Sequence, residues 1–214
     1  FDGTLRPLPY ASFQSCGRPY ANKGVYSFGN AEGSGGVMNA LKATKNSVNS
    51  AYLVMATQLD LCNIMQDAAD LGVVQPSGAD TGKNIKPYPS NVIGSDNVTP
   101  LEMASAYAAF AANGTYCQPI AITRVVDDKG KDLQVPSANC QEKLEPRIAA
   151  ATYALKNVWT GTAKKVGTPA YPAAGKTGTE TDNAYIWFVG YTPLRASAVW
   201  VGHADIKQSM HGQT

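Results

Sequence analysis

Charged residues, histidines and clustered basic residues are all scarce in this sequence. Lys, Arg, Asp and Glu together make up 16% of the 214 residues, and the formal net charge is only +2. No stripe of Lys and Arg resembles the basic surface that a phosphate backbone requires, so we expect no nucleic-acid partner. The two histidines lie near the C-terminal end and the four cysteines follow no metal-ligand spacing. A metal site is therefore not expected.

Long apolar runs are also missing. The longest unbroken run extends from Ala106 to Ala112, whereas a helix needs about 20 apolar residues to cross a bilayer. No charged-then-apolar signal stands at Phe1. Because 44% of the residues are nevertheless hydrophobic, we expect a soluble globular segment with a core of its own.

The first hundred residues alternate between loop and helix signals. Residues 1–36 and 73–98 are rich in Gly, Pro, Ser and Asn or Tyr, which predicts irregular connections. Between them the apolar residues recur at helical spacing, with one predicted face formed by Tyr52, Met55 and Leu59 and another by Leu61, Ile64, Met65, Ala68 and Leu71.

The strongest helix signal lies at residues 99–114. Thr99 can cap the helix, Pro100 suits its first position, Glu102 completes a capping box, and Gly114 provides a stop. This pattern predicts a helix without help from any other part of the chain.

The last third of the chain combines one more helix with strands. A helix is predicted from near Pro146 to Gly161, followed by strands at residues 174–179, 185–191 and 198–203. Helices that precede a closing set of strands joined by short turns indicate an α+β fold. We therefore predict an antiparallel β-sheet flanked by helices.

Cys117 and Cys140 flank a predicted hairpin at residues 120–135, whose turn lies at residues 127–130. Cysteines just outside the ends of paired strands can meet, so we predict a disulfide; the alternative is two separate buried thiols. Such a bridge would stabilise the fold by roughly 3 kcal/mol on the chain-entropy model, and it would indicate an oxidising, extracytoplasmic setting. Cys16 and Cys62 remain candidates for a second pair.

A lysine stands where the chain enters the strongly apolar segment 174-AGKTGTETDNAYIWFVGYTP-193. Gly175-Lys176-Thr177 resembles the end of a phosphate-binding loop. That reading fails, because Ala170 occupies the position of the required first glycine and a strand follows instead of a helix. The glycine cluster at residues 29–36 lacks a preceding strand and is an equally weak nucleotide signal.

A second interpretation of this lysine is that Lys-Thr-Gly-Thr lies on the edge strand of a serine acyl-transferase. The chain resembles the penicillin-recognising serine transferases, and specifically the transpeptidase domain of class A penicillin-binding proteins. The likeness extends from about residue 40 to 202 and rests on the order of 47-SVN-49, 99-TPLEMASAYAAFAANGTY-116, 176-KTGT-179, 187-WFVGYTP-193 and 199-VWVG-202.

This resemblance implies a β-lactamase/transpeptidase-like fold and a peptidoglycan D,D-transpeptidase. In that reaction a serine attacks a D-alanyl-D-alanine amide, forms an acyl-enzyme and passes the acyl group to an amine of a neighbouring strand. The implied partners are peptidoglycan stem peptides and the β-lactam antibiotics that inhibit the reaction, without any cofactor. The implied location is the extracytoplasmic face of the bacterial cell membrane, where a full-length protein is anchored.

The resemblance also implies roles for the Lys-Thr-Gly-Thr residues. Lys176 stabilises developing negative charge and bears on proton movement and on the substrate carboxylate. Thr177 and Thr179 offer hydroxyls to that carboxylate, and the backbone N–H of Thr179 forms half of an oxyanion hole. Gly178 lets the substrate lie close against the strand as an additional β-strand.

In the Ser-x-Asn motif, the resemblance implies that Ser47 relays a proton towards the leaving amine. Asn49 is implied to hold the substrate's amide and to orient the lysines, so we expect it to share a cleft with Lys176. A Ser-x-Asn triplet between two helical segments is by itself more often a cap or a turn. The order of the motifs favours the functional interpretation.

Two features depart from the family's pattern. Tyr185 in 185-YIWF-188 occupies a position where the family often has an acid, and no Ser-x-x-Lys occurs anywhere in the sequence. The nearest imitation, 162-TAKK-165, begins with threonine and follows the second motif instead of preceding it. We therefore expect residues 1–214 to be the C-terminal portion of a transpeptidase domain, with the nucleophile in an upstream segment.

Other functions share these motifs. A secreted serine β-lactamase or a D,D-carboxypeptidase would hydrolyse the acyl-enzyme instead of transferring it, although the long helix-and-loop region at residues 73–116 argues against this. A non-catalytic peptidoglycan-binding module would keep the groove and lack the serine. A Ser-x-x-Lys upstream in the complete gene product separates that module from the enzyme.

Overall fold

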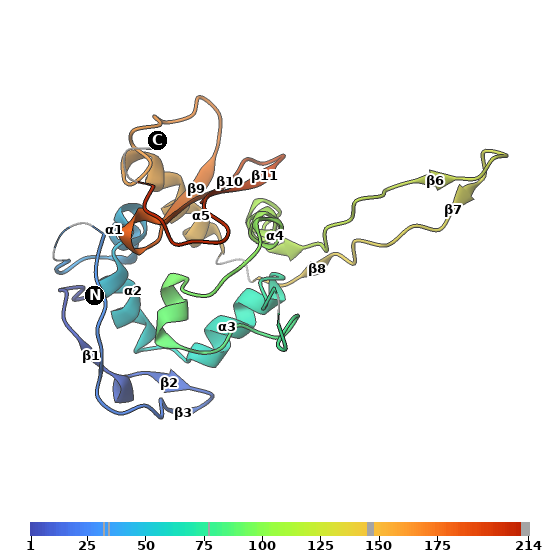
Figure 1. The fold of residues 1–214 in the computed structure, drawn as a ribbon. Helices are drawn as coiled ribbons and strands as arrows, with labels where there is room; N and C mark the ends of the chain where they lie inside the picture. Colours follow the sequence, from blue (N-terminus) through green and yellow to red (C-terminus); the bar gives the residue numbers. More distant parts are fainter. Residues whose placement is uncertain (32, 34, 77, 145–147, 211–214) are drawn as a thin grey trace.

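The computed structural model describes residues 1–31, 33, 35–76, 78–144 and 148–210. Its centre is a three-stranded antiparallel sheet formed by β9 (Ala174–Thr179), β10 (Tyr185–Tyr191) and β11 (Ala196–Gly202). The strand order is β11-β10-β9, so β9 is an edge strand of this sheet. Helices lie beside the sheet (Figure 1), and the predicted α+β architecture is confirmed.

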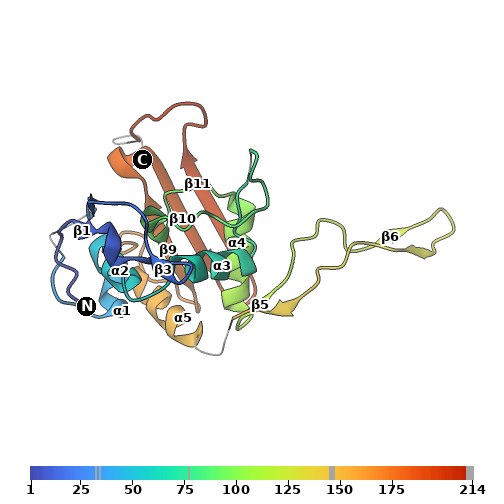
Figure 2. The same cartoon turned by 90° about the horizontal axis from the view of Figure 1, so that it is seen from below.

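The remaining regular elements are helices and short strand pairs. The helices are α1 (Ala40–Asn46), α2 (Asn49–Ala56), α3 (Leu61–Asp70), α4 (Pro100–Ala111) and α5 (Ile148–Lys156), with 3-10 turns η1 (Tyr10–Ser12), η2 (Pro89–Ile93), η3 (Asn157–Thr160) and η4 (Thr181–Asn183). In Figure 2 the sheet stands behind these helices. Contacts join α4 to β10 and β11, and α5 to β9.

Helix α4 forms where the sequence predicted it. The Thr99 hydroxyl accepts a hydrogen bond from the Glu102 amide, and the Glu102 carboxylate accepts one from the Thr99 amide at 2.9 Å. Tyr107 and Phe110 of α4 then pack against Tyr191 of β10, with ring centroids 6.1 and 6.4 Å apart. This aromatic group joins the helix to the sheet, because each ring buries a large apolar area.

The helical region between residues 40 and 71 is more broken than its periodicity predicted. Helix α2 ends at Ala56, and Leu59, predicted to lie on the same face as Tyr52 and Met55, lies outside the helix with 54% of its surface exposed. The break has a local cause, because the Asp60 side chain accepts a hydrogen bond from the Cys62 amide and caps the start of α3.

The last helix and strands match the prediction apart from their ends. The described part of α5 begins at Ile148, and the predicted start near Pro146 lies outside the described residues. The helix is followed by the 3-10 turn η3, with Gly161 as its cap. Strand β11 begins two residues before the predicted position, at Ala196.

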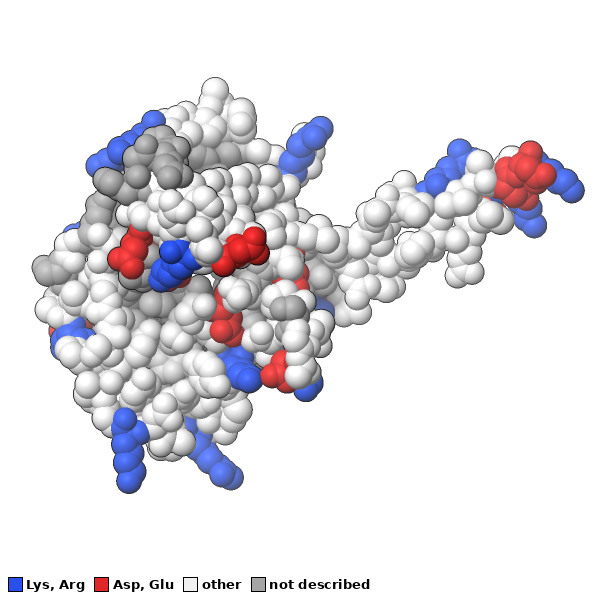
Figure 3. All heavy atoms as spheres, viewed as in Figure 1, with Lys and Arg blue, Asp and Glu red and all other residues white. Residues whose placement is uncertain are grey.

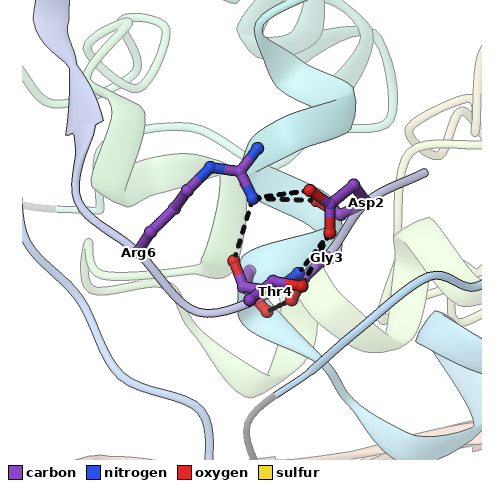
Figure 4. A network of polar contacts seen from close by, with 5 residues as sticks. Asp2, Gly3, Thr4 and Arg6 are labelled. Carbon is purple, nitrogen blue, oxygen red and sulfur yellow. Dashed lines mark hydrogen bonds and ion pairs between the residues drawn. The ribbon is translucent and has the colours of Figure 1, made fainter.

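The N-terminal segment is folded against α2. It contains two strand pairs, β1 (Leu8–Pro9) with β4 (Val25–Tyr26) and β2 (Gln14–Ser15) with β3 (Arg18–Pro19). At its start the Arg6 guanidinium nitrogen Nη1 lies 3.0 Å from the Asp2 carboxylate oxygen Oδ2. The Thr4 hydroxyl donates a hydrogen bond to the same carboxylate (Figure 4).

Gly3 fixes this segment to the second helix. Its carbonyl accepts a hydrogen bond from the buried Ser50 hydroxyl, and a Cβ at Gly3 would lie 2.9 Å from the Cβ of Ala51. A side chain at this position would therefore push the segment away from α2. This contact attaches the N-terminal segment to Ser50, the residue that follows the Ser47–Asn49 motif.

A long two-stranded arm projects from the body (Figures 1 and 2). Its base is the pair β5 (Thr115–Tyr116) and β8 (Gln141–Glu142), and its tip is the pair β6 (Val125–Val126) and β7 (Asp132–Leu133). The tip has the predicted turn, although its strands are shorter than predicted. Basic and acidic side chains gather at the tip in Figure 3, which keeps this projecting end in water.

Both cysteine pairs are joined. The predicted Cys117–Cys140 disulfide is present at the base of the arm, and Cys16–Cys62 ties the N-terminal segment to α3. The second bridge lies beside Asp60, whose carboxylate also accepts hydrogen bonds from the Cys16 and Gly17 amides.

Candidate active site

Lys176 and Ser47 meet although 129 residues separate them in sequence. Lys176 lies on the edge strand β9, and its Nζ donates a hydrogen bond of 2.8 Å to Ser47 Oγ. The sheet, the loop after α5 and the end of α1 thus bring together the Lys-Thr-Gly-Thr and Ser-x-Asn segments. The contact between them is the centre of the candidate site.

Ser47 occupies a sharp corner between two helices. It caps the C-terminal end of α1 with left-handed backbone angles, φ 55° and ψ 48°, and its amide donates to the Thr44 carbonyl at 3.2 Å. Non-glycine residues rarely adopt this conformation, and such positions cluster at functional sites. Ser47 is therefore a helix cap, which is the usual structural role of a Ser-x-Asn triplet between two helices. Its side chain also contacts Lys176.

Lys176 is a half-buried cation. Burial lowers the pKa of its ammonium from the ordinary 10.5 to about 8, because the charged form loses hydration. Its Nζ also donates to the Thr177 carbonyl at 2.9 Å. No carboxylate forms an ion pair with Lys176 within the described ranges of the chain. The positive charge is thus held in place without an acidic neighbour, as an anion-binding site requires.

Small residues bring β9 close to β10. A Cβ at Gly175 would lie 2.8 Å from the Val189 carbonyl oxygen, and one at Gly178 would lie 3.0 Å from the Trp187 Cβ. Side chains larger than hydrogen would therefore disturb the strand that holds Lys176. The other side of β9 is free of a partner strand in the described sheet.

The two threonines of the third motif differ in their surroundings. The Thr177 hydroxyl donates a hydrogen bond of 2.7 Å to the hydroxyl of Thr162, whereas Thr179 is exposed at the end of β9 and pairs with Ile186. Thr162 is the first residue of the segment 162-TAKK-165. No local pattern predicts that Thr162 reaches Thr177, because this contact depends on the path of the loop after α5.

Asn49 is the first residue of α2, and its side-chain amide donates to the Gly29 carbonyl at 2.8 Å. No hydrogen bond joins it to Lys176 among the residues that the structure describes. The expected cleft shared by Asn49 and Lys176 therefore stays a prediction. The bond to Gly29 fixes the neighbouring N-terminal segment beside the motif.

The family model of the penicillin-binding protein transpeptidase domain matches residues 13–213, which is nearly the whole chain. The chain belongs to the penicillin-binding protein transpeptidase family. The resemblance inferred from the motifs is confirmed.

Two curated relatives of this family are both named penicillin-binding protein 1A. The protein of Aquifex aeolicus is 40% identical over 170 residues, which cover 78% of this chain and 22% of the relative. The protein of Mycolicibacterium smegmatis is 34% identical over 196 residues, covering 83% of this chain and 25% of the relative. The chain thus spans about a quarter of the length of these relatives.

A solved member of the family has the same fold. The PonA1 protein from Mycobacterium tuberculosis in complex with penicillin V superposes with a TM-score of 0.73 at 25% identity. The match covers 97% of this chain and 57% of that protein. The overall arrangement of helices and sheet is therefore similar to that of PonA1.

Tyr185, which differs from the family's pattern, has an aromatic neighbour in the structure. Where the family often has an acid, the Tyr185 ring packs against Trp200 on the neighbouring strand, with centroids 5.7 Å apart. An aromatic cross-strand pair occupies this place. An acid there would lose that packing.

Neither a cluster of metal ligands nor a membrane-spanning helix occurs in the described ranges. Within them no group of three or more His, Cys, Asp or Glu side chains is arranged to hold a metal ion. None of the helices in the same ranges combines the length and the apolar character needed to cross a bilayer.

Proposed function

We propose that this chain forms part of the catalytic domain of a peptidoglycan D,D-transpeptidase that works through a serine acyl-enzyme and is inhibited by β-lactams. Ser47, Asn49 and Lys176 are its catalytic residues within the chain, and the nucleophilic serine belongs to an upstream segment. The observation that carries this proposal is the 2.8 Å hydrogen bond from Lys176 Nζ to Ser47 Oγ.

This contact provides a path for the proton in the acylation step. The nucleophilic hydroxyl attacks the carbonyl of the D-alanyl-D-alanine amide, and the C–N bond then breaks as the acyl-enzyme forms. The leaving amine must take up a proton, and the Ser47 hydroxyl can pass one on while it receives one from Lys176. The proton that the nucleophilic hydroxyl releases as its C–O bond forms then restores the Lys176 ammonium, so the net transfer is from the nucleophile to the amine. An ammonium with a pKa of about 8 gives up a proton more readily than an ordinary lysine.

The edge strand provides the substrate-binding surface. Because β9 has an open side, an extended stem peptide can pair with it as an additional strand. Gly178 permits the close approach, while Thr177 and Thr179 offer hydroxyls to the substrate carboxylate. The Thr179 N–H forms one half of the oxyanion hole and the nucleophile's own N–H forms the other.

The outer strand of the sheet supports the proposal of an upstream segment. On β11 the side chains of Val199 and Val201 are 53% and 42% exposed. Both valines alternate along β11 with Ala196, which packs into the same hydrophobic cluster as Tyr107 and Phe110 of α4, so they lie on the opposite face of the sheet. An upstream segment that packs on this face would bury both valines.

The two disulfides support an extracytoplasmic location. Disulfides persist in oxidising compartments and are rare in the cytosol. We place the domain on the outer face of the cell membrane, where peptidoglycan is available, with the anchor in another part of the intact protein.

A product analysis distinguishes this function from its alternatives. The intact gene product is incubated with a D-alanyl-D-alanine stem peptide and a second peptide that carries an acceptor amine. We expect a cross-linked dimer with release of one D-alanine. A shortened peptide without dimer would indicate a carboxypeptidase. The absence of any product, together with retained stem-peptide binding, would indicate a non-catalytic module and would contradict the proposal.

A further inference from the structure

Thr162 lies on a loop that is pressed against the end of α1. Its amide donates a hydrogen bond of 3.1 Å to the Lys45 carbonyl, two residues before Ser47. A Cβ at the preceding Gly161 would lie 2.1 Å from the same carbonyl oxygen, so only glycine permits this close approach. On the other side of Thr162, the amide of the buried Ala163 donates a hydrogen bond of 3.1 Å to the Val158 carbonyl. The backbone of Thr162 is therefore fixed from both sides.

The side chain of Thr162 closes a chain of hydrogen bonds around the site. Its hydroxyl accepts from the Thr177 hydroxyl at 2.7 Å. The Thr177 carbonyl in turn accepts from Lys176 Nζ, which also donates to Ser47 Oγ. The loop after α5 thus connects the two motif segments through a residue that belongs to neither motif.

We infer that Thr162 is a positioning residue that prepares the Thr177 hydroxyl to bind the substrate's carboxylate. This inference rests on the proposed function, in which Thr177 meets that carboxylate. A hydroxyl has one proton to donate and two lone pairs that accept. When the Thr177 proton turns to a carboxylate, the Thr162 proton can fill the vacated place by donating to Thr177 Oγ1.

The two hydroxyls then form a relay in which Thr162 donates to Thr177 and Thr177 donates to the anion. Hydrogen bonds in such a row strengthen one another, and a bond to a charged acceptor is stronger than one between neutral groups. Without Thr162, the Thr177 side chain would lose the partner that holds its rotamer while the site is empty. The relay therefore acts on binding of the carboxylate and not on the bond-breaking step.

The test compares a Thr162→Val variant of the intact gene product with the unaltered protein in acylation by penicillin. Valine keeps the shape of the side chain and removes the hydroxyl. We expect the apparent dissociation constant for penicillin to rise by up to about tenfold, which is the upper end of the effect of losing one hydrogen bond between neutral groups, while the limiting acylation rate stays within about twofold. Thr162→Ser should restore the unaltered behaviour.

Two controls separate this role from a purely structural one. Thr160→Val removes a nearby hydroxyl that, among the described residues, donates only to the Asn157 carbonyl, and it should leave penicillin binding unchanged. With penicillin methyl ester, which lacks the free carboxylate, the unaltered protein and Thr162→Val should react alike.

Equal penicillin binding by Thr162→Val and the unaltered protein would overturn the inference alone. So would an equal loss with the methyl ester, or a failure of Thr162→Ser to restore binding. An unaltered protein that never forms a penicillin adduct would contradict the proposed function and this inference with it.

Discussion

At the scale of the single residue, the protonation of Lys176 is the feature most sensitive to the folded environment. Burial disfavours its charged form and lowers its pKa from 10.5 to about 8. Between these two pH values the unfolded chain retains a proton that the folded chain has released. The free energy of unfolding therefore rises with pH through this interval, and the destabilising effect of the buried cation is complete below pH 8.

The same shift predicts how acylation by penicillin depends on pH. If the cationic form of Lys176 binds the substrate carboxylate, the second-order acylation rate should be level near pH 7 and fall above about pH 8, approaching tenfold per pH unit. Stopped-flow measurements on the intact gene product between pH 6 and 10 would reveal the alkaline limb. A rate that stays level to pH 10 would contradict a role for the charged lysine.

The left-handed backbone of Ser47 gives a second prediction. Glycine adopts these angles without strain, whereas alanine does not, so Ser47→Gly should be more stable locally than Ser47→Ala by about 1 kcal/mol. Hydrogen exchange of the amides in α1 and α2 measures the difference. Both variants lose the hydroxyl and should be equally slow in acylation. Equal exchange in the two variants would show that the corner is not strained.

Sequence alone identified the motif residues but not their surroundings. Lys176 and Ser47 could be named because their motifs occur in the family's order. The lowered pKa of Lys176 and the bond between Thr177 and Thr162 depend on how distant segments meet, and no local pattern encodes that. The place of Asn49 relative to Lys176 stays a prediction for the same reason.

At the scale of the element, the capping box at the start of α4 should stabilise that helix. Thr99→Ala removes the hydroxyl that accepts from the Glu102 amide, which should cost about 1 kcal/mol and speed hydrogen exchange in the first turn of α4 roughly fivefold. Thr99→Ser keeps the acceptor and should behave like the unaltered protein. If Thr99→Ala exchanges no faster than Thr99→Ser, the cap contributes nothing to the helix.

Elements with signals at both ends were predictable, and those without were not. Helix α4 has a capping box and a glycine stop, and β10 is a short apolar run between turns, so their positions were predicted well. The break between α2 and α3 was missed because periodicity continues across it. Asp60 sets the start of α3 by capping it. Its carboxylate also accepts hydrogen bonds from the amides of Cys16 and Gly17, which belong to a segment distant in sequence.

At the scale of the whole molecule, the two disulfides constrain different parts. Cys16–Cys62 closes a span of 46 residues that includes Ser47, whereas Cys117–Cys140 closes the 23-residue arm. The chain-entropy model gives about 4 kcal/mol for the first bridge and about 3.4 kcal/mol for the second. The site should therefore depend on the first bridge and not on the second.

Paired serine variants of the intact gene product test this separation. Replacing Cys16 and Cys62 should speed hydrogen exchange in α1, α2 and α3 and reduce penicillin acylation at elevated temperature. Replacing Cys117 and Cys140 should speed exchange only in the arm and leave acylation unchanged. An arm variant that loses acylation would mean that the arm supports the site.

The order of helices and strands along the sequence predicted the overall architecture. It did not predict the position of the catalytic serine. The α+β class and the family were predicted, and the match over residues 13–213 agrees with them. The proposed upstream segment is a different matter, because it rests on a missing Ser-x-x-Lys and on exposed valines of β11. Neither feature specifies where the nucleophile would lie in space.

The most direct test of the account replaces Lys176 by alanine in the intact gene product and follows acylation by a labelled penicillin with intact-mass spectrometry. Loss of one preorganised electrostatic group should slow acylation about 100-fold or more, while the melting temperature should not fall, because the substitution removes a buried cation. Lys129→Ala, at the exposed tip of the arm, is the matched control and should react normally. Residues 1–214 alone should form no adduct. Unaltered acylation in Lys176→Ala, or a stoichiometric adduct on residues 1–214 alone, would contradict the account.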